Sequence, residues 1–167
     1  MSKRSFGVIL LGILAVAGFG LSGYMFIKNE ILFPSNTVIR NVWYAEKFDS
    51  HYSPDDSYND IPAMNILATV NTGESVYLLF NAHAGTYGSG GPSSIQIQIK
   101  MNGILLNHPY MYVGVTGGTT DTYISICLQY SNRTLPAGIY NISICARKTT
   151  STTNWIKDRT LLIYTYV

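Results

Sequence analysis

Apolar positions along the chain follow two different patterns. From Ser5 to Ile27 the chain runs for 23 residues without a charge, whereas later apolar residues alternate with polar ones in short runs. A helix of that length reaches about 34 Å, enough to cross a hydrocarbon core of about 30 Å. Alternation with period two is typical of strands. The patterns therefore predict a hydrophobic N-terminal helix at residues 1–33, a signal anchor, followed by one β domain at residues 34–167.

The second part shows about nine strand patterns separated by turn-rich segments. The clearest covers residues 95–101 (IQIQIKM), where strict alternation indicates one buried and one wet face. Asn102-Gly103 then supplies the positive φ values of a two-residue hairpin turn. The other strands are expected at residues 37–47, 62–71, 75–83, 104–106, 110–115, 122–130, 138–147 and 159–167. Short strands without a second helical pattern indicate an all-β fold, an antiparallel β-sandwich or jelly roll.

Charges beside the apolar segment predict its orientation. Lys3 and Arg4 precede the segment, while Lys28 and Glu30 cancel each other after it. The positive-inside rule therefore places the N-terminus in the cytoplasm and the C-terminal domain outside, in a single-pass protein of the cell membrane. A cleaved secretory signal, cut after the small residues at 15–17, is the alternative. In both cases the domain is exported.

Small residues form a stripe on the predicted membrane helix. Gly7, Ala15, Gly18 and Ser22 fall near one helical face. Such stripes let membrane helices approach closely, so they favour self-association within the lipid. Membrane lipid and a second copy of the chain are thus the expected partners of this segment.

The exported part carries no net formal charge. Residues 34–167 hold eight Lys and Arg and eight Asp and Glu. Nucleic acid binding normally requires a basic face, so this class of partner is not expected. Acidic residues come mostly before position 75 and basic ones mostly after position 132. Such a division permits complementary contacts within the fold or between subunits, although most charge runs are simply solvated.

The strand segments resemble the jelly-roll domain of the tumour-necrosis-factor and complement-globular-head type. The residues that carry the resemblance are IPAMNILATVNTGESVYLLFNAH, SIQIQIKMNGILLN, TYISICLQYSNRTLPAGIYNISICARK and RTLLIYTYV. The LPAGIYNISI stretch is similar to the corner before a late strand in such domains. An apolar helix before such a domain also resembles small archaeal surface proteins. The resemblance spans residues 43–167 and implies a non-catalytic head that commonly trimerises.

Two glycosylation sequons and two cysteines are candidate modification sites. Asn132 and Asn141 each begin an Asn-x-Ser/Thr sequon, with Asn132 in a turn and Asn141 on the wet face of a strand. Cys127 and Cys145 lie in consecutive strands, where both thiols are expected to point away from the core. If the two strands form a hairpin, the cysteines can pair outside the cell; in opposite sheets they lie too far apart.

Residues suited to catalysis or metal binding are few. The loop at residues 48–60 offers Asp49, Asp55, Asp56 and Asp60 as oxygen ligands, but without EF-hand spacing, so no metal is expected. The three histidines are scattered, and no serine lies in a nucleophile elbow. The glycine-rich residues 84–93 lack the lysine and helix of a phosphate loop and indicate a strand connection. We therefore expect no enzyme and no cofactor.

Three functions remain open from the sequence. The first is a structural or adhesive surface protein whose head associates with itself, as a trimer or filament, or with an external ligand of unknown identity. The second is a filament subunit of the archaeal pilin type, with the apolar helices packed in the filament core. The third is a secreted ligand-binding domain released by signal cleavage.

Overall fold

The computed structural model describes residues 37–48, 51–87, 92–115, 121–149 and 154–167. Within it, Ile39–Val167 form one compact unit. The predicted helix at residues 1–33, with its small-residue stripe at Gly7, Ala15, Gly18 and Ser22, lies outside the described residues. Across the part that is described, no helix is long and apolar enough to span a membrane.

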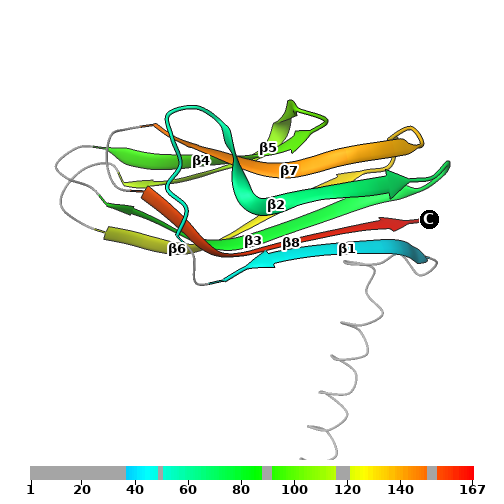
Figure 1. The fold of residues 1–167 in the computed structure, drawn as a ribbon, viewed down its shortest axis with the longest axis horizontal. Helices are drawn as coiled ribbons and strands as arrows, with labels where there is room; N and C mark the ends of the chain where they lie inside the picture. The colour runs from blue at the N-terminus through cyan, green and yellow to red at the C-terminus, as the bar shows by residue number, and fades with distance from the viewer. Residues whose placement is uncertain (1–36, 49–50, 88–91, 116–120, 150–153) are drawn as a thin grey trace, which may run out of the picture. The chain divides into compact units, whose positions relative to one another are not determined.

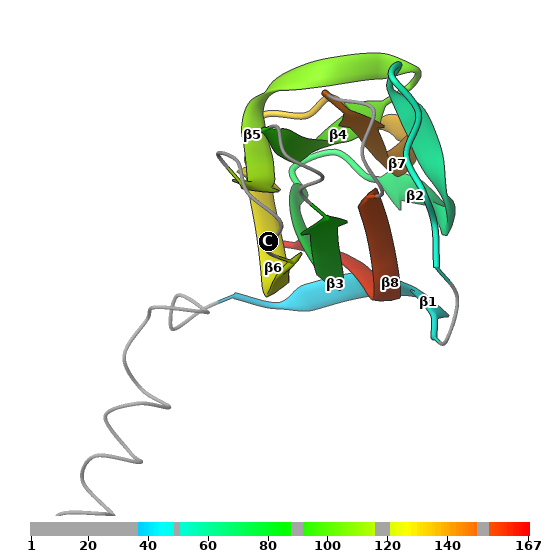
Figure 2. The same ribbon diagram turned by 90° about the vertical axis from the view of Figure 1, so that its left-hand side faces the viewer.

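The described part is an antiparallel two-sheet sandwich of eight strands (Figure 1). One sheet, here called sheet A, has the order β1-β8-β3-β6, and the other, sheet B, has the order β2-β7-β4-β5. The strands are β1 (Ile39–Lys47), β2 (Asn59–Val70), β3 (Ser75–Tyr87), β4 (Ser93–Met101), β5 (Ile104–Val115), β6 (Asp121–Asn132), β7 (Gly138–Lys148) and β8 (Asn154–Tyr166). Figure 2 shows the two layers end-on.

The strand order is that of a jelly roll. Every connection except the β4–β5 hairpin carries the chain from one sheet to the other. This topology pairs β1 with β8 and β2 with β7, so that strands far apart in sequence lie side by side. The β4–β5 turn is formed by Asn102 and Gly103 with φ values of 50° and 80°, which confirms the predicted two-residue hairpin.

The hydrophobic core lies between the sheets and is built by alternate residues of the central strands. Phe80 and Leu78 of β3 are fully buried, as are Ile97 and Ile99 of β4. Isoleucine, leucine and phenylalanine suit these positions because the pleat points every second side chain inward. Each buried side chain of this size stabilises the fold by about 1.5–3 kcal/mol relative to exposure.

The described residues form eight strands where the sequence predicts about nine. The patterns at 104–106 and 110–115 belong to one strand, β5, which contains an irregularity opposite β4: Lys100 pairs with Leu105, but Gln98 pairs with Tyr110. Extra residues on one strand break the alternation without ending the ladder, so the sequence pattern appears as two strands.

Strands β3 and β8 extend farthest beyond their predicted bounds. β3 continues through Tyr87 into the segment predicted to be a loop from residue 84, and β8 begins at Asn154 rather than at 159. Ala84 and Gly85 weaken the strand signal of β3. Asp158 adopts φ 49° and interrupts the alternation of β8.

The prediction that β4 has one wet face is wrong. Gln96 and Gln98 alternate with the core isoleucines, yet both are buried. β4 lies between β7 and β5, and Gln96 accepts a hydrogen bond from Arg147 of the neighbouring strand. Side chains of adjacent strands therefore cover the outer positions of this central strand.

Candidate functional site

A row of aromatic residues crosses three strands on the outer face of sheet A. Gly85 of β3 pairs in register with Trp155 of β8 on one side and with Tyr123 of β6 on the other. A Cβ on Gly85 would lie 2.4 Å from Cε2 and Cζ2 of Trp155. The indole therefore packs directly on the backbone of β3, where only glycine leaves room for it.

Two further rings surround the indole. The Tyr123 ring centroid lies 5.4 Å from that of Trp155, and the His51 ring, from the loop before β2, lies 5.3 Å away. Both rings are tilted against the indole, in the offset arrangements that aromatic pairs prefer. The Trp155 side chain is thus held in place by the β3 backbone at Gly85 and by the rings of Tyr123 and His51.

A polar row follows the aromatic row one pleat further along the same strands. His83 of β3 pairs in register with Lys157 of β8 and with Ser125 of β6. His83 Nδ1 lies 3.3 Å from Asp158 Oδ2, and Lys157 Nζ lies 3.8 Å from the same oxygen and 5.5 Å from the Trp155 ring centroid. The two rows together line a cavity of about 390 Å³ on this face.

A bulge in β8 determines which charged residues reach this cavity. Asp158 adopts a positive φ, and the pairing of β8 with β3 shifts register at this point. Before the bulge Lys157 lies on the outer face; after it Arg159 points inward and is only 1% exposed. Arg159 Nη1 donates to the Ile156 carbonyl at 3.0 Å, and burial lowers the pKa of its guanidinium.

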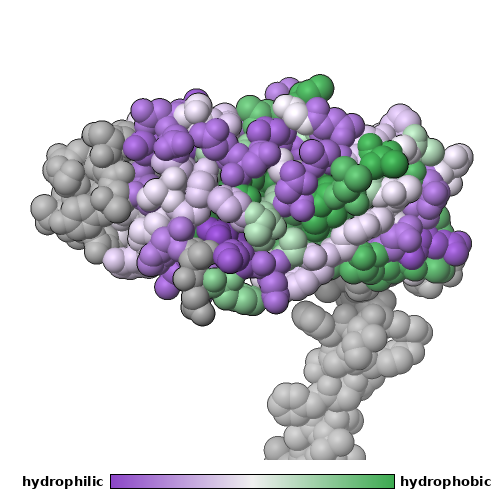
Figure 3. Space-filling model, in the orientation of Figure 1, coloured by the Kyte–Doolittle hydropathy of each residue, from purple (hydrophilic) through white to green (hydrophobic). Residues whose placement is uncertain are grey.

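The opposite half of the same face is apolar. Tyr44 of β1, Leu162 of β8 and Leu79 of β3 are paired in register, and Val42, Tyr164 and Tyr77 form the next row. The rings of Tyr77 and Tyr164 stack with centroids 5.0 Å apart. Val42 and Tyr44 lie at the edge and are more than half exposed. In Figure 3 hydrophobic side chains accordingly gather over β1, with another patch over β2.

The outer face of sheet B carries polar groups that contact one another beside exposed apolar side chains such as Leu67 of β2 and Ile139 of β7. Arg147 of β7 donates to Gln96 at 2.9 Å, and its guanidinium lies 4.7 Å from the ring centroid of Tyr58. Lys100 of β4 reaches across β7 to Asp60 of β2 at 2.6 Å. These contacts hold Arg147, Lys100 and Asp60 against neighbouring groups of the same domain.

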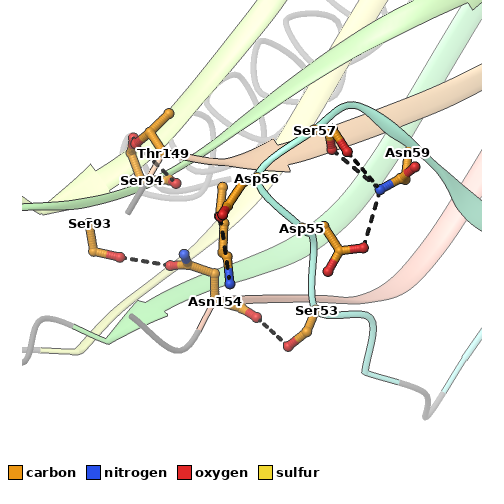
Figure 4. A network of polar contacts seen from close by, with 10 residues as sticks. Ser53, Asp55, Asp56, Ser57, Asn59, Ser93, Ser94, Thr149 and Asn154 are labelled. Carbon is orange, nitrogen blue, oxygen red and sulfur yellow. Dashed lines mark hydrogen bonds and ion pairs between the residues drawn. The ribbon is translucent and has the colours of Figure 1, made fainter. Parts of the chain in front are cut away.

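The acidic loop is tied into the fold by hydrogen bonds (Figure 4). The Asp55 carboxylate accepts from Asn59 at 3.2 Å, and its carbonyl accepts from the Lys148 amide at 2.7 Å. Asp56 lies 3.8 Å from Lys148 Nζ, and Ser53 donates to the Asn154 carbonyl at 2.8 Å. Asp49 lies outside the described residues. No group of three potential metal ligands occurs in the described ranges.

The two cysteines lie in different sheets. β6, with Cys127, pairs with β3, whereas β7, with Cys145, pairs with β2 and β4, so the hairpin alternative does not hold. Both thiols are free. Cys127 is exposed; Cys145 alternates with the core residues Ile144 and Ala146, as expected, but is buried on the outer side of β7. The Lys100–Asp60 ion pair joins the strands on either side of β7, and burial raises the pKa of the Cys145 thiol to about 11.

The two sequons occupy different surroundings. Asn132 ends β6 and is half-buried; its amide donates to the Tyr130 hydroxyl at 2.9 Å, and its oxygen accepts from the Thr134 amide at 2.8 Å. Asn141 is exposed on the outer face of β7. Glycosylation of either residue stays a prediction, although the exposed Asn141 is the more accessible acceptor.

The structure separates the three histidines. His83 lies in the polar row of sheet A, and His51 lies beside Trp155 of the aromatic row. His108 stacks on Tyr110 of β5 with ring centroids 5.3 Å apart. The sequence did not indicate that Trp155, Gly85 and His83 come together. A single glycine between strand-forming residues was the available signal, because it marks a place where another group can approach the backbone.

Comparison with known proteins identifies no family. No family model matches the chain, and no curated protein matches it. Among solved structures the chain is similar to infectious bursal disease virus chains. The Gx strain structure matches with 13% identity and a TM-score of 0.45, covering 74% of this chain and 32% of that one. The VP2 subviral particle matches with 12% identity and a TM-score of 0.42, covering 78% and 33%.

The chain thus spans about a third of the length of these viral chains. With TM-scores below 0.5, the likeness adds nothing to the strand order, on which the assignment of the jelly roll rests.

Proposed function

We propose that this chain is a membrane-anchored cell-surface protein with a structural or adhesive role, whose β-sandwich heads associate with one another. The head acts by binding rather than by catalysis. The anchor is the apolar segment at residues 5–27, and the head is exported because the flanking positive charges precede that segment. The surface of strand β1 carries the proposal of self-association.

β1 is an edge strand with an unusually apolar surface. Among the described strands it pairs with β8 alone and ends the order of sheet A. Five large apolar residues between positions 38 and 48 are more than 40% exposed: Val38, Ile39, Val42, Tyr44 and Phe48. Edge strands of soluble domains are usually protected against pairing, because their open amide and carbonyl groups recruit other strands.

The sequence of β1 is complementary to itself in antiparallel pairing. If two copies pair around Trp43, Arg40 of one copy lies opposite Glu46 of the other, and Val42 lies opposite Tyr44. Directly opposite pairs of this kind, one ionic and one apolar, each stabilise a sheet by about 0.2–1 kcal/mol. The Tyr44 hydroxyl donates to the Glu46 carboxylate at 2.7 Å and orients it on the outer face.

Pairing of this kind joins two sheets A into one continuous sheet of eight strands. The apolar rows that start at Val42 and Tyr44 then continue from one head into the other. The contact is two-fold and links heads in pairs. A filament requires a second contact, for which the small-residue stripe of the apolar segment is suited.

Light scattering on the detergent-extracted full chain tests the self-association. Val42→Asp introduces a charge opposite Tyr44 and should shift the protein toward monomer by at least about tenfold in dissociation constant. Leu67→Asp is the matched control, because Leu67 is 64% exposed against 58% for Val42 but lies on sheet B. A monomeric native chain at tens of micromolar, or equal effects of the two variants, contradicts the proposal.

Orientation and anchoring are tested separately. Protease added to intact cells should remove epitopes within residues 40–167, and protection until lysis contradicts an external head. Mass spectrometry of the native N-terminus distinguishes the anchor from the two alternatives. A pilin-like subunit is cut near Arg4, and a secreted domain is cut after Ala17. An anchor is cut at neither position and keeps its N-terminal residues.

A further inference from the structure

We propose that the Trp155 cavity on the outer face of sheet A is a binding site for a neutral saccharide in pyranose form. The inference goes beyond self-association and does not depend on it, since the cavity and β1 are formed by different residues. Three features of the cavity support it: a fixed aromatic ring, a polar row beside the ring, and balanced charge.

The aromatic ring is held before any ligand arrives. Trp155 packs on the β3 backbone at Gly85 and contacts the Tyr123 and His51 rings on its flanks. A ring fixed in this way loses little side-chain entropy on binding, which raises affinity. The faces of aromatic rings carry partial negative charge, so they attract the slightly positive C–H groups on the flat face of a pyranose.

The polar row supplies the hydrogen bonds that the hydroxyls of a saccharide require. His83, Lys157 and Ser125 lie one pleat away from the indole on the same three strands. A pyranose lying on Trp155 places its ring hydroxyls at the edge, toward this row. The cavity volume of about 390 Å³ falls within the range of about 300–1,000 Å³ that is typical of small-molecule sites.

The charges around the cavity favour a neutral ligand. The Asp158 carboxylate lies between His83 at 3.3 Å and Lys157 at 3.8 Å, so the acidic and basic groups offset each other. Lys157 also lies over the Trp155 ring, with Nζ 5.5 Å from the ring centroid, and this flexible side chain moves off the ring when a pyranose stacks there. A strongly anionic ligand would compete with the Asp158 carboxylate for the His83 ring and the Lys157 ammonium group.

Titration calorimetry on the full chain with cellohexaose, maltohexaose and chitohexaose tests the proposal. Sorbitol is the control ligand, because it carries hydroxyls without a ring face. We expect millimolar or tighter binding of at least one hexaose and none of sorbitol. In a Trp43→Phe background, Trp155 is the sole tryptophan, and its fluorescence should change in the same titration. No binding of any hexaose up to 10 mM, or equal heat with sorbitol, overturns the proposal. A dissociation constant of ~10 mM corresponds to a binding free energy of only about −3 kcal/mol.

Two pairs of variants assign the binding to the cavity. Trp155→Ala should weaken binding at least tenfold, while Trp155→Phe keeps part of it. Gly85→Ala should displace the indole and also weaken binding. Gly138→Ala is the matched control, since a Cβ there meets nothing closer than 3.7 Å. Thermal melting confirms that each variant is folded. Unchanged binding in Trp155→Ala contradicts the site even if the chain binds a hexaose.

Discussion

The two outer faces of the sandwich differ in how completely their side chains contact one another. On sheet B, Arg147, Gln96, Lys100 and Asp60 are paired within the domain. On sheet A, the edge strand β1 and the cavity at Trp155 present aromatic and apolar groups to solvent. Sheet B also exposes apolar side chains, such as Leu67 and Ile139, so exposure alone does not distinguish the two faces. They differ because polar side chains at the centre of sheet B pair with one another, whereas sheet A has the cavity at Trp155 and the open apolar edge strand β1.

The cysteines provide the largest expected difference between the faces. Cys127 is exposed on sheet A, whereas Cys145 is buried beside the Lys100–Asp60 pair and has a pKa of about 11. Thiols react as thiolates, so Cys145 should react with iodoacetamide at pH 7.5 at least about 100-fold more slowly than Cys127. Peptide mass spectrometry after timed labelling measures this. The two thiols should react at equal rates only after unfolding in guanidinium. Equal rates in the native chain contradict the burial of Cys145 in sheet B.

Substitutions at matched central positions test the same comparison through stability. Gln98→Asp places a carboxylate on the buried outer face of β4 and should destabilise the fold by about 2–3 kcal/mol. Asn81→Asp, at an exposed position of β3 on sheet A, should cost less than about 0.5 kcal/mol. Ile97→Asp in the core serves as the upper limit and should prevent folding. Denaturant unfolding compares the variants; tolerance of Gln98→Asp shows that the face is wet after all.

The turn that leads from sheet B to sheet A gives the smallest expected effect. The Glu74 carboxylate accepts from the Asn71 amide at 3.0 Å and from its side chain at 3.1 Å, and these bonds lower the pKa of Glu74. The stabilisation is therefore complete above the usual value of 4.5 and is lost as the pH falls through the lowered pKa. Glu74→Gln should cost about 1 kcal/mol at pH 7 and progressively less below pH 4.5.

Asp56→Asn, at a carboxylate that is 87% exposed and lies outside β1, is the control for this variant. Its unfolding free energy should change by less than about 0.5 kcal/mol at either pH. A Glu74→Gln effect of the same size at pH 7 and at pH 3 contradicts the hydrogen-bonded carboxylate.

The sequence predicted the layers of the fold better than it predicted the surfaces. Period-two alternation located the core isoleucines of β4 and β7, and Asn102-Gly103 located the hairpin, because both signals are local. The burial of Gln96 and Cys145 depends on side chains from neighbouring strands, which no local pattern contains. Gly85, Trp155 and Tyr123 meet only through the pairing of three strands distant in sequence, so the candidate site was not predictable.

Charge exchange across β1 tests the central claim that the edge of sheet A joins two copies. Arg40→Glu and Glu46→Arg each place like charges opposite one another in the paired strands, whereas the double variant restores attraction. Sedimentation of the detergent-extracted full chain should show self-association weakened at least about tenfold in each single variant and recovered in the double variant. Thermal melting establishes that all three are folded. Undiminished association in the single variants, or no recovery in the double variant, contradicts the account.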